Sequence, residues 1–235
     1  MKKLFMSLLL VTVIATSAYF ATSCGKTDKL MGPDVSAMQN TTDTTAGIQK
    51  PGAERMVAFS LGVPWVAQVP PGDWKNTKNC GQACAAMLGQ YFRGITANAT
   101  TIGLENWYLW HTFNDSRYNN PNGYYTGFGS RNELGTLLVG YCELRYSMLT
   151  GWTLDQVSAV AHSNQPVICG VMISGGRLVS SGGVGHWVIL LGRDSAGNVI
   201  LNDPGTSAGN HIKYSAAAFD ASWRTQGRIC AAVYR

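Results

Sequence analysis

The spacing of hydrophobic residues predicts helices in the first half of the folded part of this chain. Across Cys80–Phe92, apolar residues recur on one helical face, and Gly94 follows at the position of a helix end. Residues 131–141 also have helical spacing. Thr153–Gln156 has the sequence of a capping box, so we expect another helix from there to about Ser163.

The second half of the chain has the pattern of β-strands. Pro166 excludes continuation of the helix before it, and four apolar runs of strand length follow. These runs are residues 166–173, 186–192, 198–203 and 228–235. The sequence Asp194–Gly197 is typical of a hairpin turn. An antiparallel hairpin that closes there brings residues whose numbers sum to about 390 opposite one another, which places His186 near residues 202–204.

The segment between these two regions is expected to be mostly irregular. Residues 96–129 are aromatic and rich in turn residues, with a short helix predicted around Leu104–Trp110. The aromatic side chains of this segment either line a substrate groove or pack over the core. Helices followed by strands predict an α+β domain in which the N-terminal helix packs on an antiparallel β-sheet.

The start of the chain has the pattern of an export signal. Lys2 and Lys3 precede an apolar run at residues 4–20, which is too short and too early for a spanning helix. Small residues at positions 21–23 stand directly before Cys24, and this ending resembles a bacterial lipoprotein signal. The resemblance implies cleavage before Cys24, lipidation of that cysteine and attachment to a membrane outside the cytoplasm, in the periplasm or at the cell surface. The alternative is ordinary secretion with a free Cys24.

The remaining sequence divides into a tether and one domain. Residues 24–55 are small and polar without apolar periodicity, which is typical of a flexible tether. Residues 56–235 form one folded domain, long enough to bury roughly 70% of its unfolded surface. Removal of residues 1–23 takes two lysines and no acid, so the formal charge changes from +5 to 5 − 2 = +3. No cluster of Lys and Arg remains, which argues against nucleic acid as a partner.

Cys80 has the position of an activated nucleophile. It stands at the predicted helix start and is followed by Gly81, where partial positive charge and unpaired backbone N–H groups favour a thiolate. The late hairpin supplies a histidine and a polar partner for it. His186 is the candidate base for the thiol proton, and either Asp203 or Asn202 orients the imidazole, with Asp203 preferred.

Further residues belong to the same predicted site. Gln68 lies upstream, on a segment able to pass beside the helix start, where its side-chain amide and the backbone N–H of Cys80 would stabilise an oxyanion. Three glycines in residues 182–185 precede His186 and allow close approach of a substrate backbone. Cys84 lies one turn into the helix on its apolar face, so we expect it in the core rather than in a metal site.

The order of five sequence blocks points to a family. The blocks VPWVAQ, NCGQACAAMLGQYF, QPVICGVMI, GHWVILLGRD and NVILNDP follow one another within residues 60–206. In this order they resemble the papain-like cysteine peptidases, in particular the bacteriocin-leader-processing peptidases and their relatives. The resemblance implies a papain-like fold, Cys80 as nucleophile, His186 as base, Asp203 as orienting residue and Gln68 as oxyanion donor. No nearby histidine or carboxylate completes a metal-ligand set with Cys80 and Cys84, so we expect no metal, and we expect no cofactor.

The predicted function is therefore an exported thiol peptidase that cleaves peptide bonds of a peptide or protein through a thioester. Two alternatives stand beside it. One is an amidase that uses the same triad on cell-wall peptide, and the other is a catalytically inactive module of the same fold that binds peptides. The other cysteines of the domain either form two disulfides or are reduced core residues. They are Cys84, Cys142, Cys169 and Cys230.

Overall fold

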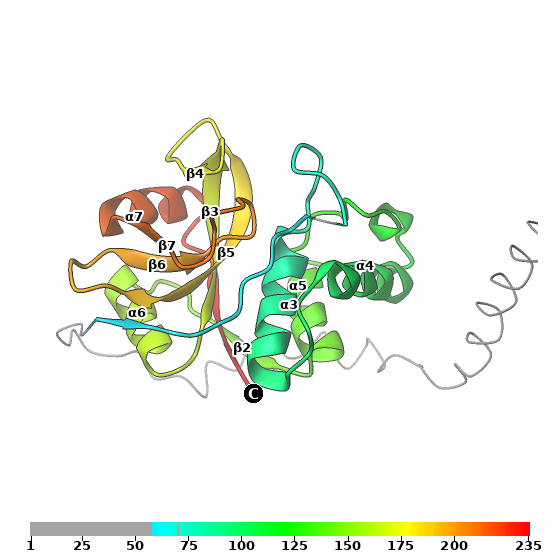
Figure 1. The fold of residues 1–235 in the computed structure, drawn as a ribbon, viewed down its shortest axis with the longest axis horizontal. Helices are drawn as coiled ribbons and strands as arrows, with labels where there is room; N and C mark the ends of the chain where they lie inside the picture. Colours follow the sequence, from blue (N-terminus) through cyan, green and yellow to red (C-terminus); the bar gives the residue numbers. More distant parts are fainter. Residues whose placement is uncertain (1–57, 70) are drawn as a thin grey trace, which may run out of the picture. The chain divides into compact units, whose positions relative to one another are not determined.

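The computed structural model describes residues 58–69 and 71–235, all within one compact unit (Figure 1). The predicted signal at residues 1–23, the predicted lipidation site Cys24 and the predicted tether at residues 24–55 lie outside the described residues. In the part of the chain that the structure describes, no helix is both long enough and apolar enough to cross a membrane.

An antiparallel sheet organises this unit. Its main path has the order β2-β8-β3-β5-β6-β7, and β1 pairs with β5 while β4 pairs with β3. The strands are β1 (Phe59–Ser60), β2 (Arg145–Met148), β3 (Val167–Ser174), β4 (Arg177–Leu178), β5 (Val184–Arg193), β6 (Val199–Asn202), β7 (Ile212–Tyr214) and β8 (Cys230–Tyr234). Strands β3, β5, β6 and β8 coincide with the four predicted runs, and every pairing is antiparallel. The expected combination of helices with an antiparallel sheet is confirmed.

Helices cover both faces of the sheet. They are α3 (Cys80–Arg93), α4 (Ala99–Phe113), η2 (Ser116–Tyr118), α5 (Glu133–Thr136), η3 (Leu137–Tyr141), α6 (Leu154–His162) and α7 (Ala216–Thr225). In Figure 1, α3 lies on one side of the sheet, and α6 and α7 lie on the other. Within β3, Ile168 belongs to the core beside α3, whereas Cys169 belongs to the core beside α6 and α7. Burial on both faces explains why these strands read as continuous apolar runs instead of alternating ones.

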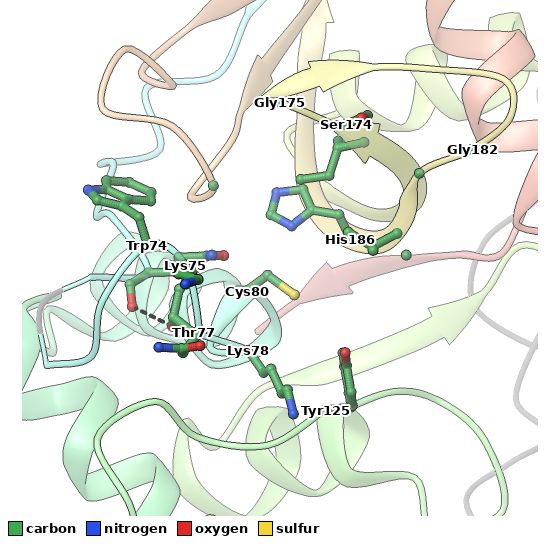
Figure 2. Close-up of a pocket in the computed structure, with 18 residues that line it drawn as sticks. Trp74, Lys75, Thr77, Lys78, Cys80, Tyr125, Ser174, Gly175, Gly182 and His186 are labelled. Atoms are coloured by element: carbon green, nitrogen blue, oxygen red, sulfur yellow. Dashed lines mark hydrogen bonds between the residues drawn. The ribbon is translucent and has the colours of Figure 1, made fainter.

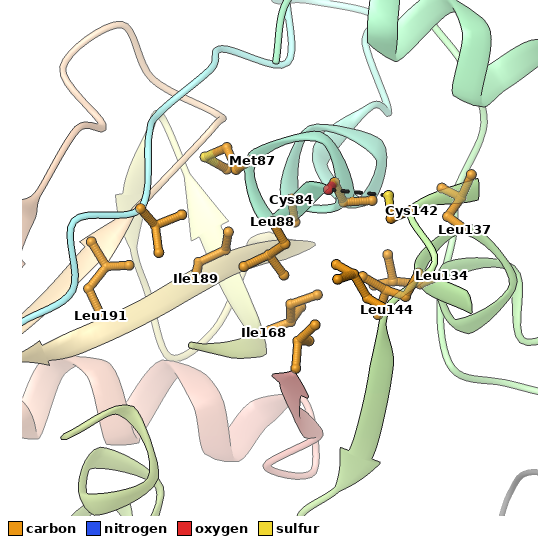
Figure 3. Packing of buried hydrophobic residues seen from close by; sticks show 14 of the residues in the cluster. Cys84, Met87, Leu88, Leu134, Leu137, Cys142, Leu144, Ile168, Ile189 and Leu191 are labelled. Carbon is orange, nitrogen blue, oxygen red and sulfur yellow. Dashed lines mark hydrogen bonds between the residues drawn. The ribbon is translucent and has the colours of Figure 1, made fainter. Parts of the chain in front are cut away.

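Helix α3 confirms the predicted helix and buries its first ten residues. Gly94 ends it in the left-handed conformation, with φ of 72°. Cys84 and Leu88 belong to the same hydrophobic cluster as Ile189 of β5, which Figure 3 shows from close by. The Cys84 side chain is fully buried, so Cys84 is a core residue as expected. This packing brings the first residue of α3 to the sheet.

The β5–β6 hairpin has the predicted turn. The Gly197 amide donates to the carbonyl oxygen of Asp194 at 3.0 Å, and Gly197 has a φ of 81°. Ile189 pairs with Asn202, so opposite residues here sum to 189 + 202 = 391, close to the expected register. His186 lies beyond this last pair and is paired only with β3, at Val171. Its side chain is therefore at the open end of the hairpin, next to the residues that follow β6.

Helix α4 corrects the prediction for the irregular segment. It is 15 residues long, from Ala99 to Phe113, whereas the sequence predicts only a short helix around Leu104–Trp110. The side chain of Asn98 caps its start. Its buried face includes the polar residues Glu105 and Asn106, which interrupt the apolar spacing by which a helix is recognised.

The remaining helices are partly predicted. Helix α5 continues directly into the π-helix η3, so the predicted helical region at residues 131–141 is confirmed from residue 133 onward. Helix α6 begins at the predicted capping box, in which the Thr153 amide donates to Gln156 Oε1 at 2.9 Å and the Gln156 amide donates to Thr153 Oγ1 at 3.3 Å. Helix α7 is not predicted, and its start is capped by the side chain of Ser215.

Glu105 is the residue of α4 whose burial has the clearest cost. Its side chain is fully buried, and neither carboxyl oxygen has a hydrogen-bond partner. Burial raises the pKa of Glu105 well above its ordinary value of 4.5. The unfolded chain then loses this proton at lower pH than the folded chain. As a result, the free energy of unfolding decreases as pH rises above about 4.5.

We expect Glu105→Met to raise the free energy of unfolding by about 1–3 kcal/mol at pH 7, because it removes a buried group without partners. The gain should shrink as pH falls below about 4.5, where Glu105 becomes protonated in both states. Denaturant unfolding of parent and variant at several pH values measures this. Glu105→Gln keeps the shape without the titrating group, so it should lose the same pH dependence. Equal pH slopes in all three proteins would contradict the argument.

Candidate active site

Cys80 is the first residue of α3, and Asn79 is the residue before it. The Ala83 amide donates to the Asn79 carbonyl oxygen at 2.8 Å, so the helical hydrogen bonds begin at this point. The Cys80 side chain therefore lies at the positive end of the helix dipole. Cys80 is 9% exposed and lines a cleft of ≈ 480 Å³ (Figure 2).

A buried network of amide side chains holds the start of α3. Asn79 Nδ2 donates to the carbonyl oxygen of Pro121 at 2.8 Å, and Asn106 Nδ2 of α4 donates to Asn79 Oδ1 at 3.0 Å. Gln82 Nε2 in turn donates to Asn106 Oδ1 at 2.8 Å and to the Tyr124 carbonyl oxygen at 3.2 Å. The sequence offered no signal for this network, because isolated Asn and Gln residues are common on surfaces. It ties the backbone next to Cys80 to α4 and to the aromatic segment.

His186 and Asp203 are in direct contact, as predicted. His186 Nε2 lies 2.7 Å from Asp203 Oδ1, and both residues are buried. The same carboxyl oxygen accepts the Gly205 amide at 2.7 Å. Asn202 has a different role: its Nδ2 donates to the Val63 carbonyl oxygen at 2.9 Å, and its side-chain oxygen accepts from a backbone amide. Of the two residues that the sequence leaves open, it is Asp203 that meets the imidazole.

Cys80 and His186 line the same cleft, and each shifts the pKa of the other. Because Nε2 of His186 contacts Asp203, Nδ1 is the ring nitrogen left available to the thiol. Burial raises the pKa of Cys80, but the hydrogen bond and positive charge of His186, together with backbone N–H groups of Trp187 and Gly81, lower it by more, so the Cys80 pKa is lowered overall. Burial lowers the pKa of His186, yet hydrogen bonds and charges of Asp203 and Cys80 outweigh it and raise that pKa to about 10. Both shifts favour a thiolate–imidazolium pair.

Gln68 reaches the same cleft. The backbone amide of Gln68 donates to the carbonyl oxygen of Pro204 at 2.9 Å, and Pro204 is the residue after Asp203. The carbonyl oxygen of Gln68 accepts from Asn79 Nδ2 at 3.4 Å. The side chain is 7% exposed and lines the cleft, and its Oε1 has no hydrogen-bond partner. Gln68, Cys80 and His186 thus line one cleft, with Asp203 buried behind the imidazole.

Glycines shape the cleft on the side of β5. Gly182 has a φ of 67° and open space where a side chain would be, so this loop leaves room beside His186 (Figure 2). Gly205 has the opposite constraint, because a Cβ atom there would lie 2.7 Å from the imidazole Cε1. Sequence reasoning missed Gly205. The only signal was its place in the turn directly after Asp203 and Pro204.

The cysteines outside the site are structural. In the described residues, all five cysteines are free thiols. Of the two alternatives that the sequence leaves open, disulfides or reduced core residues, the structure has the reduced residues. Cys169 and Cys230 are direct partners across β3 and β8 and are both buried. Burial raises the pKa of Cys84 well above its ordinary value, which keeps that thiol protonated. Between residues 58 and 235, apart from residue 70, no group of three His, Cys, Asp or Glu residues is arranged to hold a metal ion.

Solved structures resemble this fold. A candidate C39-like peptidase from Bacillus anthracis aligns with a TM-score of 0.52 and 22% identity, over 76% of this chain and 98% of that chain. The two chains share a fold. No family model and no curated protein matches this sequence. The likeness agrees with the helix-and-antiparallel-sheet architecture described above, and at this identity it concerns the fold alone.

Proposed function

We propose that the protein is a cysteine peptidase with a papain-like arrangement, in which Cys80 is the nucleophile and His186 is the general base and acid. The observation that carries this proposal is that Cys80, at the start of α3, and His186 line the same open cleft, with the imidazole held by the buried Asp203 at 2.7 Å. The shared fold with a candidate C39-like peptidase supports it. Asp203 is a positioning residue in this scheme, because it acts on substrate only through the imidazole.

The chemistry follows from the thiolate–imidazolium pair. The Cys80 thiolate attacks the substrate carbonyl carbon, and the bond to the leaving amine breaks as the imidazolium of His186 gives that amine its proton. The remaining acyl group is a thioester on Cys80. Neutral His186 then takes a proton from water as the water attacks the thioester. Collapse of this second intermediate releases the carboxylic acid, and the thiolate–imidazolium pair is restored.

Gln68 fits the task of stabilising the oxyanion. Each tetrahedral intermediate bears a negative oxygen close to the sulfur, and donors fixed there in advance lower the barrier. The backbone N–H of Cys80 is unpaired by the helix because it belongs to the first turn. Gln68 lines the same cleft as Cys80, on a backbone held at Pro204 and Asn79. We assign these two groups to the oxyanion site.

Asp203 holds the imidazole of His186 in one tautomer and one orientation. Its Oδ1 accepts from Nε2, which leaves Nδ1 to exchange the proton with Cys80. The negative charge also stabilises the imidazolium. Gly205 keeps the carboxylate in place through its amide.

The proposal includes a place for the enzyme outside the cytoplasm, with a lipid anchor on Cys24. This part depends on the sequence of residues 1–24, which lie outside the described residues. An anchored peptidase meets peptides and proteins of the cell envelope as its substrates. The predicted partners are thus a peptide or protein substrate and a membrane, without nucleic acid.

The function is tested by offering the full-length protein, under reducing conditions, an unfolded protein and purified peptidoglycan fragments. We expect new amino termini in the unfolded protein, measured by mass spectrometry. We also expect alkylation of Cys80 at neutral pH, because its thiol pKa is lowered. Cleavage restricted to peptidoglycan peptide would instead indicate an amidase. No cleavage of either substrate, with alkylation only above about pH 8.5, would indicate an inactive binding module and refute the proposal.

A further inference from the structure

The cleft beside Cys80 has a positive charge balance. Lys75 and Lys78 line it together with His186, and no Asp or Glu does so among the described residues. Within those residues, no carboxylate forms an ion pair with either lysine. The nearest acid along the chain, Asp73, accepts hydrogen bonds from the backbone amides of Lys75 and Asn76 at 3.1 Å and 3.0 Å, so its carboxylate belongs to its own turn.

Lys78 is the better placed of the two lysines. It is half-buried, whereas Lys75 is exposed, and it lies only two residues before Cys80. Its Nζ is 4.8 Å from the ring centroid of Tyr125 and 5.5 Å from that of Tyr124. Cation–π contacts of this kind hold an ammonium group in place without neutralising its charge. In Figure 2, Lys78 and Tyr125 lie beside each other, on the other side of Cys80 from His186.

Exposed apolar side chains also gather on this cleft. Trp74, Tyr125 and Val184 are 47%, 56% and 62% exposed, and all three line it. They make up three of the five large hydrophobic residues that are exposed in the described part of the chain. Exposed apolar groups that collect at one place, next to an unpaired charge, mark a binding surface. The chemistry of this surface suits a peptide with acidic and apolar side chains.

We propose that the cleft selects peptides with a Glu or Asp side chain close to the scissile bond, and that Lys78 is the specificity-determining residue that binds this carboxylate. The inference rests on the proposed peptidase function, because it describes a subsite of the same cleft. Lys78 and Cys80 are two residues apart in the enzyme, so their Cα atoms are separated by at most about 7 Å. We assign the carboxylate bound by Lys78 to one of the two substrate residues on either side of the bond that Cys80 attacks.

The test uses peptides that differ only in having Glu, Gln or Lys at one of these four positions. For the parent enzyme, we expect kcat/KM to be about 10-fold higher for Glu than for Gln at one position, with Lys worst. Lys78→Met keeps an unbranched aliphatic side chain without the charge and should bring the Glu/Gln ratio to about 1. Lys78→Glu should reverse the preference to the Lys peptide. Lys213→Met changes the net charge equally outside the cleft and should keep the parent ratio.

Two results would overturn the inference while leaving the peptidase proposal standing. One is equal cleavage of the Glu and Gln peptides by the parent, and the other is an unchanged ratio in Lys78→Met. If no peptide is cleaved, the peptidase proposal fails, and binding decides the inference by itself. Fluorescence anisotropy with labelled peptides then compares Cys80→Ala with the double variant that also carries Lys78→Met. A roughly 10-fold tighter Kd of the first for the Glu peptide supports the subsite, and equal Kd values refute it.

Discussion

Cys80→Ala should lower kcat/KM for peptide hydrolysis by about 10⁶-fold, because the acyl group then has no atom to which it can be transferred. The same variant should leave no rapidly alkylated thiol between residues 58 and 235, since the other cysteines of that range are buried in the core. Product formation followed by mass spectrometry, together with peptide mapping after alkylation, measures both effects. Turnover by the alanine variant at the parent rate would end the assignment of Cys80.

Cys84→Ala is the matched control for this variant. Cys84 lies one turn further along the same helix, is fully buried, and has a thiol pKa that burial raises. Its removal should reduce the free energy of unfolding through lost packing, while kcat/KM stays near the parent value. Circular dichroism and thermal unfolding establish that both variants are folded. Loss of activity in both would show that α3, rather than one thiol, is being disturbed.

Asp203→Ala should reduce kcat by about 10⁴-fold, because the imidazole loses the group that selects its tautomer and stabilises its charge. The pH profile of kcat/KM separates this role from a structural one. For the parent, we expect activity to rise as Cys80 ionises, below pH 9, and to fall as His186 loses its proton near pH 10. These limbs belong to the coupled pair rather than to either residue alone.

Asp203→Asn provides the sharper experiment. An amide oxygen at this position still accepts hydrogen bonds from His186 Nε2 and from the Gly205 amide, but it has no charge. Since the Asp203 carboxylate raises the pKa of His186, its neutralisation should move the alkaline limb to lower pH. Asn202→Ala removes the neighbouring side chain, which donates a hydrogen bond to the Val63 carbonyl oxygen. This variant should lower the free energy of unfolding and leave the alkaline limb of the pH profile unchanged. An alkaline limb unchanged in Asp203→Asn would refute the assigned role.

Polar residues inside the protein account for most of what sequence reasoning missed. Helix α4 was predicted too short because Glu105 and Asn106 occupy its buried face, where the periodicity rule expects apolar residues. Asn106 is tolerated there because Asn79 and Gln82 complete its hydrogen bonds. Those partners come from α3 and from the residue directly before it, so no local pattern contains them. The position of Lys78 at the cleft could not be predicted for the same reason, because its neighbours Tyr124 and Tyr125 are more than forty residues away in the sequence.

The sequence by itself determined the elements whose signal is local. Continuous apolar runs, a capping box, a turn composition and a Cys at a helix start were sufficient to predict β3, β5, β6, β8, α3 and α6, and to bring His186 near residues 202–204. Tertiary structure alone decided that Asp203 rather than Asn202 meets the imidazole, that Gln68 reaches the cleft through its bond to Pro204, and that the cleft is basic. The reason is physical. Hydrophobic periodicity reports which face of an element is buried, whereas the direction of a polar side chain depends on partners that only the folded chain brings within hydrogen-bonding distance.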